Sequence, residues 1–205
     1  EFVDDWTAPH ELVHLYIPYP GETDLWLSEG LATYYQYLLQ ARAGIKTEQQ
    51  AWQKIYEGFE RGRKDNRHPY LSLAELSRDM QEYRSYMRVY WSGTLYFLEA
   101  DMALRQASGG RQTLDSVIRE FTVCCRPDAI YWRGSSLVKA LDKSAGNTLF
   151  TDLYYEYRQH KALPDYHPLL ARLGITIKQG KVVLSTQNSA TGALRHAISS
   201  SINPA

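Results

Sequence analysis

The chain has 205 residues, 44% of them hydrophobic, which is enough to bury the core of one large domain. Lysine plus arginine and aspartate plus glutamate number 23 each, so the net charge is zero and nothing favours a nucleic-acid or anionic-membrane partner. No apolar run approaches the roughly 20 residues that span a membrane. We therefore expect a soluble globular protein; its compartment stays open, because any signal peptide would lie upstream of this sequence.

The first segment that carries chemistry is His10-Glu11-Leu12-Val13-His14, in a helix predicted over about residues 5–16. Residues four apart share one face of a helix, so both imidazoles can reach one cation. Zinc takes nitrogen ligands at about 2.0–2.1 Å, and a catalytic site keeps one position for water. Glu11 is placed to take a proton from that water. We predict that His10 and His14 are metal ligands and that Glu11 is the general base.

A second helix, predicted over about residues 25–43, supplies the remaining metal ligand. Two prolines and a glycine between residues 16 and 21 end the first helix and let the chain turn back. The two helices then bring Glu29 beside the histidines as the third ligand of one zinc ion per chain. Thr33, one turn after Glu29, is either a hydrogen-bond partner of a ligand histidine or an ordinary packed residue.

Two other interpretations of these segments are less favoured than a catalytic metal site. The HExxH pattern alone also occurs in helices with two ordinary histidines, but an acid on a separate helix after a proline-glycine turn makes that interpretation less favoured. A structural metal site is also less favoured, because three protein ligands leave one position open, whereas structural zinc sites are closed by four.

The segments HELVH and LWLSEGLATYY together resemble the gluzincin zinc metallopeptidases, and within them the glycyl aminopeptidase family. The large zinc aminopeptidases are a more distant resemblance, with a longer gap before the glutamate. The resemblance covers roughly residues 5–175. It implies a mainly α, thermolysin-like catalytic domain, acting on peptide substrates. It also implies that this chain is a fragment, lacking the family's upstream β-rich region, which we expect to pack on this domain.

Later helices follow from apolar residues at helical spacing. They are predicted over residues 47–63, from 72, in the later part of 86–104, and over 113–123, 135–144 and 149–160. Capping-box patterns support the starts of the first two of these helices: Thr47 is followed three residues later by Gln50, and Ser72 by Glu75.

Peptide hydrolysis passes through a tetrahedral oxyanion, which a tyrosine hydroxyl can stabilise. In the related aminopeptidases this tyrosine belongs to a Tyr-x-x-Gly pattern just before a long helix. Tyr90-Trp91-Ser92-Gly93 matches that pattern in sequence and position, although the chain has 16 tyrosines. The resemblance therefore implies that Tyr90 is a catalytic residue, with Tyr86 as the alternative.

Near the C-terminus, residues 175–178 and 181–184 flank Gln179-Gly180 and predict a small β-hairpin. From Ser185 onward the composition is polar and predicts a tail or linker. We therefore expect a helical zinc-peptidase catalytic domain over residues 1–174 and a hairpin with a polar tail or linker over 175–205.

The combined prediction is a zinc-dependent peptidase, specifically an aminopeptidase. Glu11 would activate a zinc-bound water, and Tyr90 would stabilise the oxyanion. The alternative is a non-catalytic interaction module on a peptidase-like fold, which would bind a partner regardless of Glu11.

Overall fold

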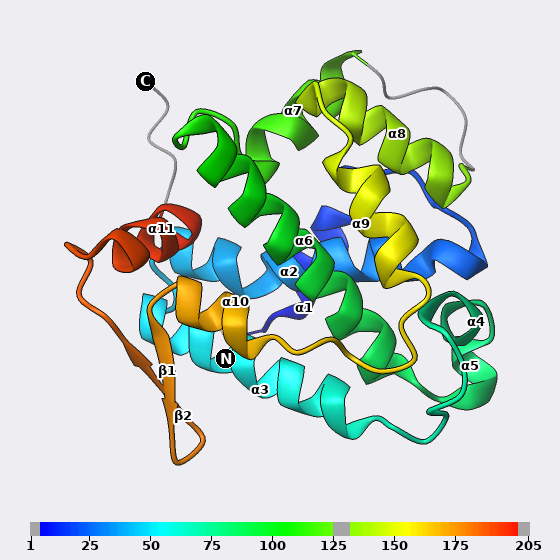
Figure 1. Cartoon of the computed structure of the whole chain (residues 1–205), viewed down its shortest axis with the longest axis horizontal. Coiled ribbons are helices and arrows are strands. Elements are labelled where there is room, and N and C mark those ends of the chain that lie inside the picture. The colour runs from blue at the N-terminus through cyan, green and yellow to red at the C-terminus, as the bar shows by residue number, and fades with distance from the viewer. Residues whose placement is uncertain (1–4, 125–131, 201–205) are drawn as a thin grey trace.

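The computed structural model describes residues 5–124 and 132–200. Figure 1 shows a mainly helical fold with one two-stranded hairpin, which confirms the predicted fold class. The elements are α1 (Thr7–Val13), η2 (Glu22–Asp24), α2 (Leu25–Arg42), α3 (Glu48–Lys64), α4 (Leu73–Arg78), α5 (Met80–Tyr83), α6 (Tyr86–Ser108), α7 (Leu114–Cys124), α8 (Gly134–Ala145), α9 (Leu149–Tyr157), α10 (His167–Arg172), β1 (Ile175–Lys178), β2 (Lys181–Leu184) and α11 (Ala190–Ser199).

The centre of the molecule is the crossing of α2 and α6 (Figure 1). Two glycines let the helix backbones touch there. A Cβ added at Gly30 would lie 2.4 Å from the Cα of Gly93, and one added at Gly93 would lie 2.0 Å from the carbonyl oxygen of Trp26. The crossing brings the second turn of α2, with Glu29, beside the start of α6, with Tyr90.

The predicted capping residues begin their helices. Thr47 Oγ1 accepts from the Gln50 backbone amide at 3.2 Å, and Gln50 Oε1 accepts from the Thr47 amide at 2.8 Å. Ser72 and Glu75 form the same reciprocal pair at the start of α4. These capping boxes satisfy amides that have no partner inside their helices.

Several helix bounds differ from the sequence prediction. The first helix is shorter than residues 5–16, because α1 spans Thr7–Val13. The long helix starts at Tyr86, so Tyr90 lies inside α6 rather than before it. The predicted helix over 149–160 ends at Tyr157, and α10 was not predicted. None of the described helices has the length and apolar character needed to cross a bilayer.

The expectation of a polar tail after Ser185 is wrong for residues 190–199, which form α11. Ser189 caps this helix by accepting from the Gly192 amide at 3.0 Å. Arg195, only 1% exposed, donates to the carbonyl oxygens of Leu173 and Ser185 at 3.0 and 2.7 Å. The sequence prediction failed because one buried arginine, rather than an apolar stripe, anchors much of this helix.

The hairpin and α11 pack against the helical part of the chain. The antiparallel strands pair Ile175 with Leu184, and the Val182 amide donates to Gln53 Oε1 on α3 at 2.8 Å. Arg195 donates to Glu48 at 3.2 Å, again on α3. Arg42 on α2 donates to the Ile198 carbonyl at 2.8 Å. The boundary between residues 174 and 175 stays a prediction.

Candidate metal centre

The candidate centre is built by two helices that run close together after a tight turn. His10 lies on the buried face of α1, and His14 is the residue that directly follows this helix, still in right-handed helical conformation. The chain then reverses through Gly21, whose φ of 84° suits glycine, and enters α2 at Leu25. Glu29 lies in the second turn of α2, on the side that faces the two histidines.

The three predicted ligands converge in the structure. Glu29 Oε2 lies 3.2 Å from His10 Nε2 and 3.9 Å from His14 Nε2. One possible ligand atom from each residue lies within 4.8 Å of the others. Over residues 5–124 and 132–200, this is the single group of three or more histidine, cysteine or acidic side chains with such a spacing.

The donor set fits a zinc ion. A tetrahedral ion with bonds of about 2.1 Å has ligand atoms separated by about 3.4 Å, and the two measured separations lie on either side of that value. Burial lowers the pKa of His14, and the negative charge of Glu29, the second largest cause, acts in the other direction and raises it. A lowered pKa favours the neutral imidazole, which is the form that binds a metal.

Two polar side chains of α2 contact the histidine nitrogens that face away from Glu29. Gln36 Oε1 lies 3.0 Å from His10 Nδ1, and Ser28 Oγ lies 3.0 Å from His14 Nδ1. Thr33 Oγ1 is buried and has no hydrogen-bond partner among the described residues, so the packed interpretation of Thr33 is the one that fits. The sequence could have indicated this role of Gln36, because it follows Glu29 by seven residues and so lies two helical turns along the same face.

Tyr90 and Glu11 both lie near the candidate ligands. The ring of Tyr90 stacks on His10, with centroids 6.1 Å apart and planes 20° apart. Burial, followed by the charge of Glu29, raises the pKa of Tyr90. Glu11 is exposed, and its charge acts on the pKa of both His14 and Tyr90. Tyr86, the alternative, is 38% exposed, one turn before Tyr90 on α6.

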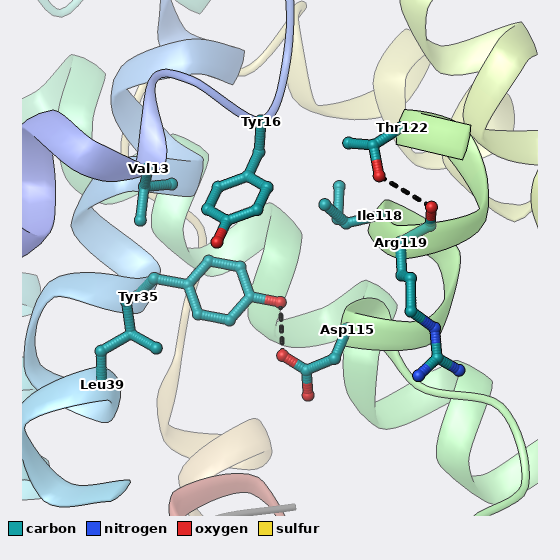
Figure 2. A pocket seen from close by; sticks show the side chains of 8 residues that line it. All are labelled: Val13, Tyr16, Tyr35, Leu39, Asp115, Ile118, Arg119 and Thr122. Atoms are coloured by element: carbon teal, nitrogen blue, oxygen red, sulfur yellow. Dashed lines mark hydrogen bonds between the residues drawn. The ribbon is translucent and has the colours of Figure 1, made fainter. Parts of the chain in front are cut away.

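A cavity of about 310 Å³ lies behind α1, against α2 and α7 (Figure 2). Its walls include Val13, Tyr16 and Ile118, and the Tyr35 hydroxyl beside it donates to Asp115 at 2.9 Å. The residues that line the cavity include none of the three candidate ligands, Glu11 or Tyr90, so the cavity forms no part of the candidate centre.

Part of the chain is similar to a known family of peptidases. Residues 18–96 match the family model of the M61 glycyl aminopeptidase, which confirms the resemblance to this family and supports a peptidase function. The matched segment contains Glu29, Gln36 and Tyr90 and starts just after His14. No curated protein matches the chain.

Proposed function

We propose that the chain is a zinc-dependent peptidase of the aminopeptidase type, whose metal is held by His10, His14 and Glu29. The observation that supports this most is the convergence of the three side chains, with Glu29 Oε2 at 3.2 and 3.9 Å from the two histidine nitrogens. A carboxylate and two imidazoles are a common ligand set of catalytic zinc, and they leave one position open.

Zinc bound at this site would supply Lewis acidity to an attacking water and to the carbonyl of the scissile bond. The chain's own residues would handle the protons and the charge. Glu11 would take the proton of the attacking water and pass it to the leaving amine. Its exposure leaves it accessible to water and substrate.

Tyr90 would donate its hydroxyl proton in a hydrogen bond to the oxyanion. The hydroxyl of a tyrosine is protonated at neutral pH, which is the state that can donate, and burial raises the pKa of Tyr90 further above its ordinary value of 10. A hydrogen bond with Glu29 is among the causes of the raised pKa of Tyr90, so the hydroxyl lies beside a proposed metal ligand. Peptides with a free amino terminus are the substrate class that the family match favours.

The test compares Glu11→Gln with the wild type. The substrates are fluorogenic peptides with free or acetylated amino termini, and zinc content is measured on the same samples. We expect Glu11→Gln to lose hydrolysis by a factor of about 10² to 10⁴, because the base is lost, while keeping its zinc. Glu82→Gln, which changes an exposed carboxylate on α5, is the matched control and should keep full activity.

Full turnover by Glu11→Gln would rule out the proposed role of Glu11. Equal cleavage of free and acetylated peptides would contradict the aminopeptidase assignment. Zinc binding without any hydrolysis, together with partner binding that is indifferent to Glu11, would instead identify a non-catalytic interaction module.

A further inference from the structure

The three polar groups that face the two histidines from α2 are Ser28, Glu29 and Gln36. Glu29 approaches the Nε2 atoms, whereas Ser28 and Gln36 each approach one Nδ1 atom at 3.0 Å. Gln36 is 4% exposed and Ser28 is 6% exposed, so both contacts are shielded from bulk water. One helix therefore presents a metal ligand together with the groups that contact the far side of the other two ligands.

The Nδ1 contacts determine which ring nitrogen is free to bind a metal. A neutral imidazole carries one N–H, and the other nitrogen holds the lone pair. When His10 Nδ1–H donates to the amide oxygen of Gln36, the lone pair belongs to Nε2, which faces Glu29. The hydroxyl oxygen of Ser28 can accept from His14 Nδ1–H in the same way.

We propose that Gln36 and Ser28 are positioning residues that hold His10 and His14 with their Nε2 lone pairs directed at the metal. This inference rests on the proposed function, because it takes the three ligands as a zinc site. It assigns roles to two side chains that neither touch the metal nor react. Partners of this kind orient the ligands and raise their basicity, and their loss weakens metal binding about 10- to 100-fold.

The two residues contribute unequally. The His10 side chain is 5% exposed, so water cannot readily replace Gln36 after substitution. The His14 side chain is 27% exposed, so water can replace the Ser28 hydroxyl. Gln36 is also a neutral acceptor where many zinc sites use a carboxylate, so Gln36→Glu keeps the acceptor and adds a charge that strengthens the ligand.

The test measures the zinc dissociation constant of the purified chain by competition with a chromophoric chelator. The variants are Gln36→Leu, Gln36→Glu and Ser28→Ala, with Gln40→Leu as the matched control. Gln40 lies one turn further along α2, is 1% exposed, and donates to the Asp5 carbonyl away from the histidines. Visible spectra of the cobalt-substituted proteins report the coordination geometry independently of activity, and thermal melts of the metal-free proteins identify folding defects.

We expect Gln36→Leu to weaken zinc binding about 10- to 100-fold, Ser28→Ala to weaken it less, and Gln36→Glu to bind at least as tightly as the wild type. Gln40→Leu should match the wild type. A dissociation constant for Gln36→Leu within twofold of the wild type, or an equal loss in Gln36→Leu and Gln40→Leu, would overturn the inference alone. Failure of the wild type to bind zinc would overturn the proposed function as well.

Discussion

Replacing Gly93 by alanine should destabilise the fold, although alanine is the better helix former. The higher helix propensity of alanine alone would stabilise α6 by about 1 kcal/mol. The new Cβ, however, would lie 2.0 Å from the Trp26 carbonyl oxygen and would meet the Gly30 backbone at 2.7 Å. These are backbone atoms, which cannot rotate away, so α2 and α6 must separate. Overpacking costs up to about 3 kcal/mol, which leaves a net loss of about 2 kcal/mol.

Chemical denaturation measures this loss directly, and the melting temperature should fall by about 4–8 °C for a chain of this size. Ser92→Ala, at the preceding position of α6, adds no atoms and should cost at most about 1 kcal/mol. An unchanged or increased stability of Gly93→Ala would refute the close helix crossing. The same separation would move Glu29, a proposed metal ligand, away from Tyr90, the proposed oxyanion donor, so the rate of peptide hydrolysis offers a second readout.

Two further predictions concern the C-terminal helix and the pH dependence of stability. Arg195→Ala should lower the free energy of unfolding by about 3 kcal/mol, because it removes the donor to two buried carbonyl oxygens and the cation beside Glu48. Exposed Lys181→Ala should have little effect, and equal free energies of unfolding for the two variants would show that Arg195 does not stabilise the fold. Hydrogen bonds from Arg63 and then Tyr166 lower the pKa of Glu60 to about 2 from an ordinary value of 4.5. The stability contributed by ionised Glu60 is therefore present above pH 4.5 and is lost as the pH falls towards 2. Over this range the free energy of unfolding of the wild type should fall more steeply than that of Glu60→Gln. Parallel plots of the free energy of unfolding against pH would contradict the lowered pKa of Glu60.

The sequence predicted those parts of the fold that depend on local signals. Apolar spacing located the helices, and Thr47 and Ser72 fixed two helix starts because their caps involve residues only three positions apart. The bounds of α1 were overestimated: the helix begins at Thr7, whose amide donates to the Asp5 side chain, and it ends at Val13. The missed helix α11 has a local start signal, because Ser189 caps the Gly192 amide, but its anchoring depends on contacts from Arg195 to residues as far away as Glu48.

At the candidate centre, the sequence predicted the residues that converge but not their supporting contacts. His10, His14 and Glu29 follow from the spacing of one motif and one turn, and the structure brings them together. From the sequence, Thr33 was either a partner of a ligand histidine or a packed residue, and no role was predicted for Gln36, although it also lies on the Glu29 face of α2. Side-chain length decides between them: Gln36 reaches the His10 ring, whereas the Thr33 hydroxyl has no described partner.

The proposed metal centre is tested most directly by X-ray diffraction from crystals of the zinc-loaded chain at the zinc absorption edge. We expect one anomalous peak per chain, at bonding distances of about 2.0–2.2 Å from His10 Nε2, His14 Nε2 and a Glu29 carboxylate oxygen. A peak at any other group of residues, or none between α1 and α2 in zinc-loaded crystals, would contradict it.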